Sequence, residues 1–354
     1  MLRLDSTPDS PKPASVRLVL SRPDRIGDVV ISTSCFEAIK QALPGVEIFF
    51  LAQPQMAPLL RGANSPVHFV SLPKHGQATQ RMEALAAHLR RLGPQCLIHL
   101  QPDQEVEWAA AAAEIPRRIG FRLHGDKWLT DSLPYTKKLG EKHEGYYNFD
   151  LLEIIGIHHP AKLQPHLAPE ATALDRLATK LPLPLCTHPY AVLHIGAHEG
   201  KPRVAPEYFV AAAQWLINEK RCYVVLIGVG KDDPQVHAVL DGLGPAAAWA
   251  FNFCGQTDLA EAAWLLRQAV LVFGRDSGPA HLAAAMGAPT VTLMLEPDQV
   301  NSARRWTPLG ERSWVLEKPL RRRLLETRPG FARRNLRQFT TDEIVAALRY
   351  AMEK

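Results

Sequence analysis

The sequence predicts an α/β protein made of two halves, each with a parallel β-sheet covered by helices. Short apolar segments alternate along the chain with longer segments in which apolar residues recur at helical spacing. This alternation is typical of β–α–β units, whose strands run parallel. The 354 residues exceed one typical domain and suit two. Between residues 151 and 189 the sequence becomes rich in proline and poor in strand patterns, as expected of a connection between domains.

The first half is expected to contain four strands and three helices. Its strands are predicted at residues 16–20, 46–51, 67–70 and 96–100, and its helices at 27–42, 79–92 and 107–113. The first of these helices should end before Pro44 and Gly45, because both residues disfavour a helix. The chain therefore opens with a strand, a loop and a helix in direct succession.

The second half repeats the alternation of strands and helices. Its strands are predicted at 190–195, 222–228, 270–273 and 290–294, and its helices at 206–218, 259–267, 277–286 and 341–352. The expected division of the chain is a disordered lead-in at 1–15, a first domain at 16–170, a linker at 171–189, a second domain at 190–335 and a final helix at 336–354.

Composition places the chain among ordinary globular proteins. It is 46% hydrophobic and 22% charged, and no apolar run approaches the roughly 20 residues that cross a bilayer. The first fifteen residues carry three prolines and several polar residues in place of the apolar segment of a signal peptide. The five cysteines are scattered and never spaced as Cys-x-x-Cys, which favours a reducing cytoplasm and argues against a zinc site or a disulfide framework.

One segment carries most of the positive charge. Residues 318–337 hold eight basic residues and one acid, a charge of +7 (8 − 1), against +5 for the whole chain. Such a segment is either a solvated surface loop or a site of attraction for an anionic surface, such as membrane lipid, a phosphorylated acceptor or nucleic acid. Nucleic acid is the least favoured of these partners, because the segment lacks a series of aromatic residues that would stack on bases.

The most informative stretch is residues 274–290, which begin Gly-Arg-Asp-Ser-Gly-Pro-Ala-His. An apolar strand ends where this stretch begins, and a helix follows with Ser277 in the N-cap position and a proline in its first turn. Gly278 allows a ligand to approach the backbone, and His281 projects one turn later on the face of Ser277. A helix start after a tight turn is a site for phosphate or another anion. The alternative is an ordinary capped junction, which does not need these residues and Asp276 together.

The loop at 21–28 follows the first predicted strand. It contains Gly27, which permits close approach, and it ends in Asp28 at the start of a helix. There the helix dipole favours the ionised carboxylate, which suits a functional aspartate. Simple capping of the helix is the alternative role for this residue.

Two loops of the second half also lie after predicted strands, where ligands bind in open α/β sheets. The loop at 194–203 contains two glycines, Lys201 and Arg203, all of which suit contact with a phosphate. The other loop spans 228–234. Neither the Walker pattern nor the Gly-x-Gly-x-x-Gly fingerprint occurs, so the chain predicts neither of those two nucleotide sites.

Two of these stretches resemble the signature motifs of the ADP-heptose:lipopolysaccharide heptosyltransferases, glycosyltransferase family 9, which builds the inner core of bacterial lipopolysaccharide. Residues 25–33, Arg-Ile-Gly-Asp-Val-Val-Ile-Ser-Thr, are similar to the N-terminal motif. Residues 276–290, from Asp-Ser-Gly-Pro-Ala-His to Gly-Ala-Pro-Thr, are similar to the longer and more specific C-terminal motif. Weaker likenesses at 206–209, 259–263 and 306–310 extend the resemblance from about residue 16 to the C-terminus.

The resemblance implies the GT-B fold, in which two Rossmann-like domains with parallel sheets face a central cleft. The N-terminal domain would bind the acceptor sugar and the C-terminal domain the ADP-sugar, and the final helix at 336–354 would cross back to the N-terminal domain. The implied partners are ADP-heptose, a lipopolysaccharide inner-core acceptor and the anionic surface of the inner membrane, on its cytoplasmic face. No nucleic acid, cofactor or metal is expected, since the ADP-sugar is itself a substrate.

Motif position also implies roles for individual residues. Asp28 corresponds to the family's catalytic base, with Arg25 and Gly27 in its acceptor-side loop. The implied donor-binding residues are Lys201, Arg203, Asp276, Ser277, Gly278 and His281. The base would take the proton of the acceptor hydroxyl, and the helix start and basic side chains would stabilise the departing ADP. Attack on the face opposite the leaving group would invert the anomeric carbon.

Two other classes of function remain open. One is a GT-B enzyme that uses another nucleotide sugar, as a transferase or an epimerase. Three departures from the family pattern on the donor side keep this class open: Ala205 replaces a usual tryptophan, Arg275 a usual small polar residue, and residues 294–298, Met-Leu-Glu-Pro-Asp, a usual Phe-Gly-Pro-Thr. The other class is a non-catalytic nucleotide-binding or membrane-surface protein, which the intact Asp28, Asp276 and His281 disfavour. The sequence specifies neither the acceptor hydroxyl nor the oligomeric state.

Overall fold

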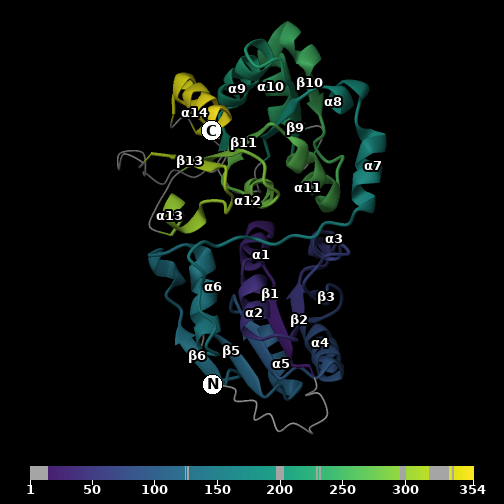
Figure 1. Ribbon diagram of the computed structural model, residues 1–354, viewed down its shortest axis with the longest axis vertical. Coiled ribbons are helices and arrows are strands. Elements are labelled where there is room, and N and C mark those ends of the chain that lie inside the picture. The colour runs from purple at the N-terminus through teal and green to yellow at the C-terminus, as the bar shows by residue number, and fades with distance from the viewer. Residues whose placement is uncertain are drawn as a thin grey trace. The chain divides into compact units, whose positions relative to one another are not determined.

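The computed structural model contains two compact units, Met1–Ala168 and Pro169–Lys354, each built on a parallel sheet (Figure 1). The structure describes residues 15–123, 125, 127–196, 203–228, 230, 233–295, 300–318, 335–336 and 339–354. The lead-in predicted at 1–15 lies, apart from Ser15, outside the described residues, and so does most of the basic segment at 318–337. Among the described residues, no helix is long and apolar enough to cross a membrane.

The first unit has a six-stranded parallel sheet in the order β3-β2-β1-β4-β5-β6. Its strands are β1 (Arg17–Arg22), β2 (Glu47–Ala52), β3 (His68–Ser71), β4 (Cys96–His99), β5 (Arg117–Arg122) and β6 (Asp131–Pro134). Its helices are α1 (Ile26–Ser32), α2 (Cys35–Ala42), α3 (Ala57–Leu60), α4 (Ala78–Leu92), α5 (Gln104–Ala112) and α6 (Glu144–Glu153), with short 3₁₀ turns η1 (Pro54–Met56) and η2 (Lys137–Leu139). Helices α4 and α5 pack together on one face, and α1 and α2 pack with α6 on the other.

Strands β5 and β6, helices α3 and α6 and the turns η1 and η2 of this unit are absent from the sequence prediction. Strand β5 was hidden by the arginines at its ends, β6 is short and polar, and α6 mixes apolar with polar residues. In addition, the helix predicted at 27–42 is two helices, α1 and α2, which meet at Thr33 and Ser34. The two hydroxyls donate hydrogen bonds of 2.7 Å to the carbonyl oxygens of Val30 and Ile31, and so compete with regular helix hydrogen bonds.

The residues of β1 divide between the two faces of the sheet by alternation. Val19 is buried against the layer of α4 and α5, in an apolar core with Leu89 of α4 and Leu97 of β4. Arg22 lies at the opposite parity, so its side chain points to the face covered by α1 and α6. A charged side chain therefore occupies a position where a strand of a parallel sheet is ordinarily apolar.

The second unit has a six-stranded parallel sheet in the order β10-β9-β7-β11-β12-β13, and a separate pair of short strands, β8 and β14. Its strands are β7 (Tyr190–His194), β8 (Arg203–Val204), β9 (Tyr223–Ile227), β10 (Ala250–Asn252), β11 (Leu271–Arg275), β12 (Thr290–Met294), β13 (Ser313–Glu317) and β14 (Asn335–Leu336). Its helices are α7 (Thr172–Lys180), α8 (Leu183–Thr187), α9 (Pro206–Asn218), α10 (Pro234–Leu243), the 3₁₀ helix η3 (Gly244–Trp249), α11 (Leu259–Gln268), α12 (Gly278–Ala285), α13 (Ala303–Trp306) and α14 (Thr341–Glu353).

The segment expected as a linker at 171–189 contains two helices, α7 and α8, and α7 packs against α11 of the second unit. Arg176 of α7 donates to the Asp258 carboxylate at 2.7 Å, and Lys180 donates to Glu261 at 2.6 Å. Glu261 is buried, so this contact fixes α7 on the unit. The prolines of this segment suggested a linker. A proline is tolerated in the first turn of a helix, as in α8, and the sequence alone does not distinguish it from a proline in a loop.

The final helix α14 also differs from its expected place. Its residues Ile344, Leu348 and Ala351 are buried in the apolar core of the second unit, together with Phe209 of α9. The start of α14 is fixed by a capping box, in which the Thr340 hydroxyl accepts from the Glu343 amide. By this packing α14 belongs to the second unit, whereas the sequence expectation was a crossing to the first.

Candidate functional site

The two large sheets share one strand order. Numbered along each unit, both read 3-2-1-4-5-6, with the first and fourth strands adjacent at the centre. At that point the connections leave in opposite directions, and ligands of open α/β sheets bind at the carboxyl ends of these strands. The two points are the ends of β1 and β4 in the first unit, and of β7 and β11 in the second. The predicted site residues follow β1, β7 and β11.

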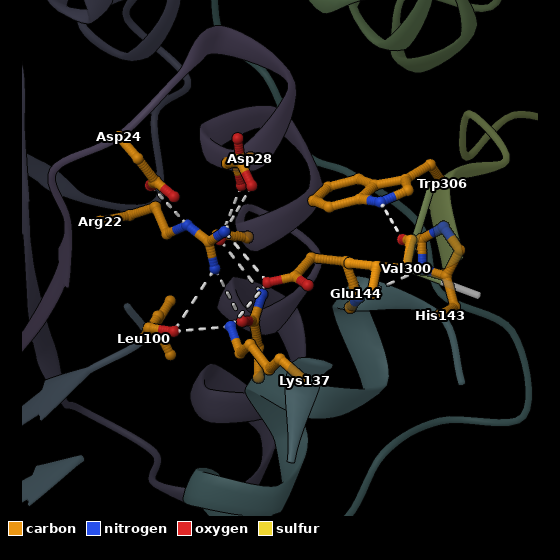
Figure 2. Close-up of polar contacts among 12 residues, drawn as sticks. Arg22, Asp24, Asp28, Leu100, Lys137, His143, Glu144, Val300 and Trp306 are labelled. Carbon is orange, nitrogen blue, oxygen red and sulfur yellow. Dashed lines mark hydrogen bonds and ion pairs between the residues drawn. The ribbon is translucent and has the colours of Figure 1, made fainter. Parts of the chain in front are cut away.

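Arg22 ends strand β1 and is the centre of a buried polar cluster (Figure 2). Its side chain is 1% exposed. A guanidinium has five N–H groups, and each of the five is used here. The acceptors are the carboxylates of Asp24 (Nε, 2.7 Å), Asp28 (Nη2, 2.6 Å) and Glu144 (Nη2, 3.0 Å), the amide oxygen of Asn148 (Nη1, 3.1 Å) and the main-chain oxygen of Leu100 (Nη1, 3.4 Å). The guanidinium is thereby held in one orientation.

Asp28 lies in the first turn of α1, as predicted, but its side chain does not cap the helix. Helix α1 has Arg25 in the N-cap position, with no side-chain capping bond. One carboxylate oxygen of Asp28, Oδ1, pairs with Arg22, and the side chain remains 14% exposed. Its main-chain oxygen accepts a hydrogen bond of 2.8 Å from the Ser32 hydroxyl. Capping is thus excluded as its role. Among the described residues, the carboxylate is held through one of its two oxygens, Oδ1.

Glu144 and Asn148 hold Arg22 from α6, more than a hundred residues further along the chain. Lys137 joins them: its Nζ donates to Glu144 at 2.6 Å and to the Leu100 oxygen at 2.8 Å. Glu144 and Lys137 are both fully buried. Sequence reasoning missed all three residues. The available signal was that Glu144 and Asn148 lie four residues apart and so share the buried stripe of α6.

Burial and charge shift the pKa values in this cluster. Burial lowers the pKa of Lys137 to about 8, with Arg22 acting in the same direction and Glu144 against it. Burial raises the pKa of Asp24, and the nearby Asp28 adds to that rise, while Arg22 opposes it. For Arg22 burial alone would lower the pKa, but Asp24, Asp28 and Glu144 together raise it above the usual range. The guanidinium is therefore permanently charged.

The corresponding point of the second unit is lined by His194 and a glycine. His194 ends β7, and its register partner on β11 is Gly274. A Cβ at Gly274 would lie 3.0 Å from both the Cβ and the main-chain oxygen of His194, so only glycine fits without displacement of the backbone. Burial lowers the pKa of His194 to about 4, and Arg275 adds to the shift. His194 is therefore neutral at physiological pH.

Ser277 is the N-cap residue of α12, as predicted, but its hydroxyl does not cap the helix. The hydroxyl oxygen lies 3.1 Å from Nδ1 of His194 and 3.1 Å from the main-chain oxygen of Arg275. A hydroxyl has one proton, so a bond donated to the Arg275 oxygen makes His194 Nδ1 the donor to Ser277. Because the side chain is turned away, the first amides of α12, beginning at Gly278, receive no side-chain cap.

Asp276 and His281 meet at the same helix start. Their Oδ1 and Nε2 atoms are 3.3 Å apart, and His281 is buried while Asp276 is partly exposed. The imidazole of His281 contacts Trp306 edge to face, with ring centroids 6.5 Å apart. The guanidinium of Arg305 lies over the Trp306 ring, 4.7 Å from its centroid. The structure thus brings Asp276, Ser277 and His281 together around one helix start.

Arg203, in β8, is held by the start of α10. Its Nη1 donates to both carboxylate oxygens of Asp233, at 2.7 and 2.9 Å, and lies 3.3 Å from the amide oxygen of Gln235. Burial tends to raise the pKa of Asp233, but the bonds from Arg203 and from the Gln235 amide outweigh it, so the pKa is lowered. Lys201, the other predicted cation, lies outside the described residues.

The sequence matches the family model described as glycosyltransferase family 9 (heptosyltransferase) over residues 82–320, more than half of the chain. The chain belongs to glycosyltransferase family 9. A lipooligosaccharide heptosyltransferase 2 of Haemophilus ducreyi is 24% identical over 346 residues, which cover 94% of this chain and 98% of that protein. The family predicted from the two motifs is thereby confirmed.

Two solved structures share the fold of this family member. The ADP-heptose lipopolysaccharide heptosyltransferase II of E. coli matches with a TM-score of 0.74 and 22% identity, over 96% of this chain and 99% of that one. A family 9 glycosyl transferase of Veillonella parvula matches with a TM-score of 0.77 and 17% identity, over 96% and 97%. These matches, with the two six-stranded parallel sheets, confirm the predicted GT-B class of fold.

Proposed function

We propose that this family 9 enzyme moves a heptose from ADP-heptose to a sugar of the lipopolysaccharide inner core, with inversion and with Asp28 as general base. The observation that carries the proposal is the anchoring of Asp28 by one N–H of Arg22 through Oδ1, so that Oδ2 has no hydrogen bond to that guanidinium. The choice of substrates is supported by the relatives, one described as a lipooligosaccharide heptosyltransferase and another as an ADP-heptose enzyme.

The proposed reaction is one displacement at the anomeric carbon of the donor. The acceptor oxygen forms the new bond to this carbon as its proton passes to Asp28, because a neutral hydroxyl is a poor nucleophile. The bond from the anomeric carbon to the phosphate oxygen breaks, and ADP departs with that electron pair. Attack from the side opposite to ADP inverts the anomeric configuration.

Charge balance in the buried cluster favours the role given to Asp28. The cations Arg22 and Lys137 face three carboxylates, those of Asp24, Asp28 and Glu144. With all five groups charged the cluster carries one negative charge in excess. Uptake of the acceptor proton by Asp28 leaves two cations and two anions, so the product of the proton transfer is balanced in an environment of low dielectric constant.

The donor diphosphate is assigned to the second unit. The start of α12 offers amides at and after Gly278 that Ser277 does not cap, and a helix N-terminus attracts phosphate. Arg203 and Lys201 would supply positive charge for the departing ADP, since fixed dipoles and cations stabilise charge that develops in a reaction. Asp276 and His281 would bind hydroxyls of the donor sugar. The scheme requires no cofactor and no metal ion.

The role of Asp28 is tested by Asp28→Asn. Turnover with ADP-heptose should fall by roughly a hundredfold to ten-thousandfold, the range for loss of a general base, while the affinity for ADP stays nearly unchanged. The matched control is Asp131→Asn, which removes an aspartate from a partly exposed pair with Arg117 in the same unit. Near wild-type turnover in Asp28→Asn would assign the base elsewhere.

The donor is tested by product analysis with ADP-heptose and with UDP-sugars, read by mass spectrometry of the acceptor. ADP should also bind more tightly than UDP in calorimetry. Transfer from a UDP-sugar, or epimerised sugar without transfer, would leave the family membership in place but replace ADP-heptose as the donor. Binding of ADP with no transfer to any acceptor would favour the non-catalytic alternative.

We further propose that the basic segment at 318–337 attracts the enzyme to anionic lipid at the cytoplasmic face of the inner membrane. Neutralising Arg321, Arg322 and Arg323 together should weaken binding to liposomes that contain acidic lipid. The difference should shrink as salt rises, since screening at 0.1 M limits such attraction to about 10 Å. Equal binding of both proteins at low salt would make the segment an ordinary solvated loop.

A further inference from the structure

Asp24 and Asp28 divide between them one edge of the Arg22 guanidinium (Figure 2). Asp24 accepts from Nε at 2.7 Å, and Asp28 accepts from Nη2 at 2.6 Å. These two nitrogens form the side-on edge of an arginine, which a single carboxylate commonly occupies with both of its oxygens. Two aspartates on one edge lie close to each other, and each has only half of the usual set of bonds.

The remaining charged groups around this edge are two cations and a third carboxylate. The positive groups are Arg22 on β1 and Lys137 on η2, and the third carboxylate is Glu144 on α6. Burial holds the pKa of His99 on β4 at about 3 and raises the pKa of the Cys35 thiol on α2 to about 12, so both are neutral at physiological pH. With Lys137 charged and with Asp24 and Asp28 both ionised, three carboxylates face two cations, and the cluster carries one negative charge in excess.

We propose that Asp24 is a positioning residue that makes Asp28 accept the acceptor proton more readily, by sharing the Arg22 guanidinium and adding a like charge beside it. This inference rests on the proposed function of Asp28 as general base. In the absence of the Asp24 charge, Arg22 would stabilise the ionised form of Asp28 more fully, and the proton would be taken up less easily. The raised pKa of Asp24 agrees with this geometry, because burial and the neighbouring Asp28 are its two causes.

Exposure and supporting hydrogen bonds distinguish Asp28, the proposed base, from Asp24. Asp24 precedes α1 and has a side chain 27% exposed, against 14% for Asp28. Asp28 has a further main-chain tie through Ser32, which in turn accepts a hydrogen bond of 3.1 Å from Asn148. Asp28 thus lies on a braced helix, whereas Asp24 lies on a loop held through Arg22. Pre-organisation favours the braced carboxylate for the reaction.

The test is Asp24→Asn, which removes the charge but keeps an oxygen that accepts from Nε of Arg22. Transfer from ADP-heptose should be measured as kcat and kcat/KM across the pH range in which the protein stays folded. The midpoint of the acid limb should move to lower pH, since the variant lacks an anion that favours proton uptake at the shared edge of Arg22. On the plateau, kcat should fall about two- to tenfold because the base is weaker, with KM for the donor unchanged.

A structural role alone predicts a different result. If Asp24 only braces the loop, Asp24→Asn lowers kcat or the melting temperature and leaves the midpoint of the acid limb in place, and that outcome overturns the proposal. Asp24→Ser, which is also neutral, gives the same readout if the asparagine variant does not fold. Asp24→Glu keeps the charge and should keep the wild-type midpoint.

The proposal fails independently of the function on which it rests. Asp28→Asn reports on the general base, and the Asp24 variants report on its environment. Loss of turnover in Asp28→Asn with an unmoved midpoint in Asp24→Asn would retain the base and remove the role of Asp24. Full turnover in Asp28→Asn would remove both.

Discussion

The same position in two copies of one strand order is used in opposite ways. In the first unit the end of β1 carries Arg22, a charge buried among five acceptors. In the second unit the end of β7 carries His194, which is neutral and lies against Gly274 of β11. The first position holds a cation whose five N–H groups are all hydrogen-bonded. The second holds a neutral imidazole, packed closely against a glycine.

Under the proposed function, the shared topology serves two tasks, proton transfer in the first unit and anion binding in the second. Proton transfer requires a carboxylate that does not move, and the fully bonded guanidinium of Arg22 fixes Asp28. Anion binding requires donors that the protein has not already used, and His194 draws the Ser277 hydroxyl away from the amides of α12. In that proposal, the strand order supplies the place, and the side chains paired at that place give each unit its chemistry.

Removal of the buried cation of the first unit should have the strongest effect on stability. Arg22→Met should lower the free energy of unfolding of that unit by about 3–5 kcal/mol, because buried carboxylates lose their cation. The matched control is Arg17→Met, on the same strand, whose exposed pair with Glu47 is screened by solvent and should contribute little to stability. Urea unfolding of both variants measures the difference. Equal losses would mean that the cluster is not a stability element.

An intermediate effect is expected for the cation of the second unit. Arg203→Ala should weaken ADP binding by about 1.5–3 kcal/mol, the range for a hydrogen bond to a charged group, and should change the stability of the protein little. Calorimetric titration with ADP measures it. Arg267→Ala, on α11 of the same unit and stacked on Trp264, is the control and should bind ADP as the wild type does. Identical affinities in the two variants would exclude Arg203 from the diphosphate site.

A smaller effect is expected on the pH dependence of stability, because His194 is neutral where Arg22 is charged. The pKa of His194 is lowered to about 4 in the folded protein, so between pH 6.5 and 4 protons bind the unfolded chain preferentially. The stability of the second unit should therefore fall as the pH falls, by about 1–2 kcal/mol between pH 6.5 and 5. Melting curves of His194→Gln should lack this part of the pH dependence. A wild-type dependence retained in the variant would assign it to other groups.

Local patterns in the sequence predicted most of the fold. Eight strands and most helices follow from apolar segments alternating with helical spacing, because this periodicity is a property of short windows. The motif at 276–290 likewise places Asp276, Ser277 and His281 at one helix start, since residues within one turn of a helix are necessarily neighbours. Their roles toward the donor stay predictions.

Other features were not available to such windows. The split of the helix at 27–42 depends on hydroxyls that turn back on the backbone, and the packing of α14 depends on which unit covers its apolar face. Strand β5 has arginines at both ends, so its burial in the middle of a sheet is visible only once its neighbours β4 and β6 are in place.

From the sequence alone it could be predicted that Asp28 lies at the start of a helix after the first strand, and that a Ser-Gly-Pro helix start follows the strand at 270–273. The contacts of those residues follow from the three-dimensional fold. Glu144 reaches Arg22 across 122 positions of the chain, and Lys137 reaches the same carboxylate from a separate turn. A charge is tolerated in a buried strand only when its partners arrive from elsewhere, and the order of strands and helices in space, which no short stretch of sequence encodes, brings them there.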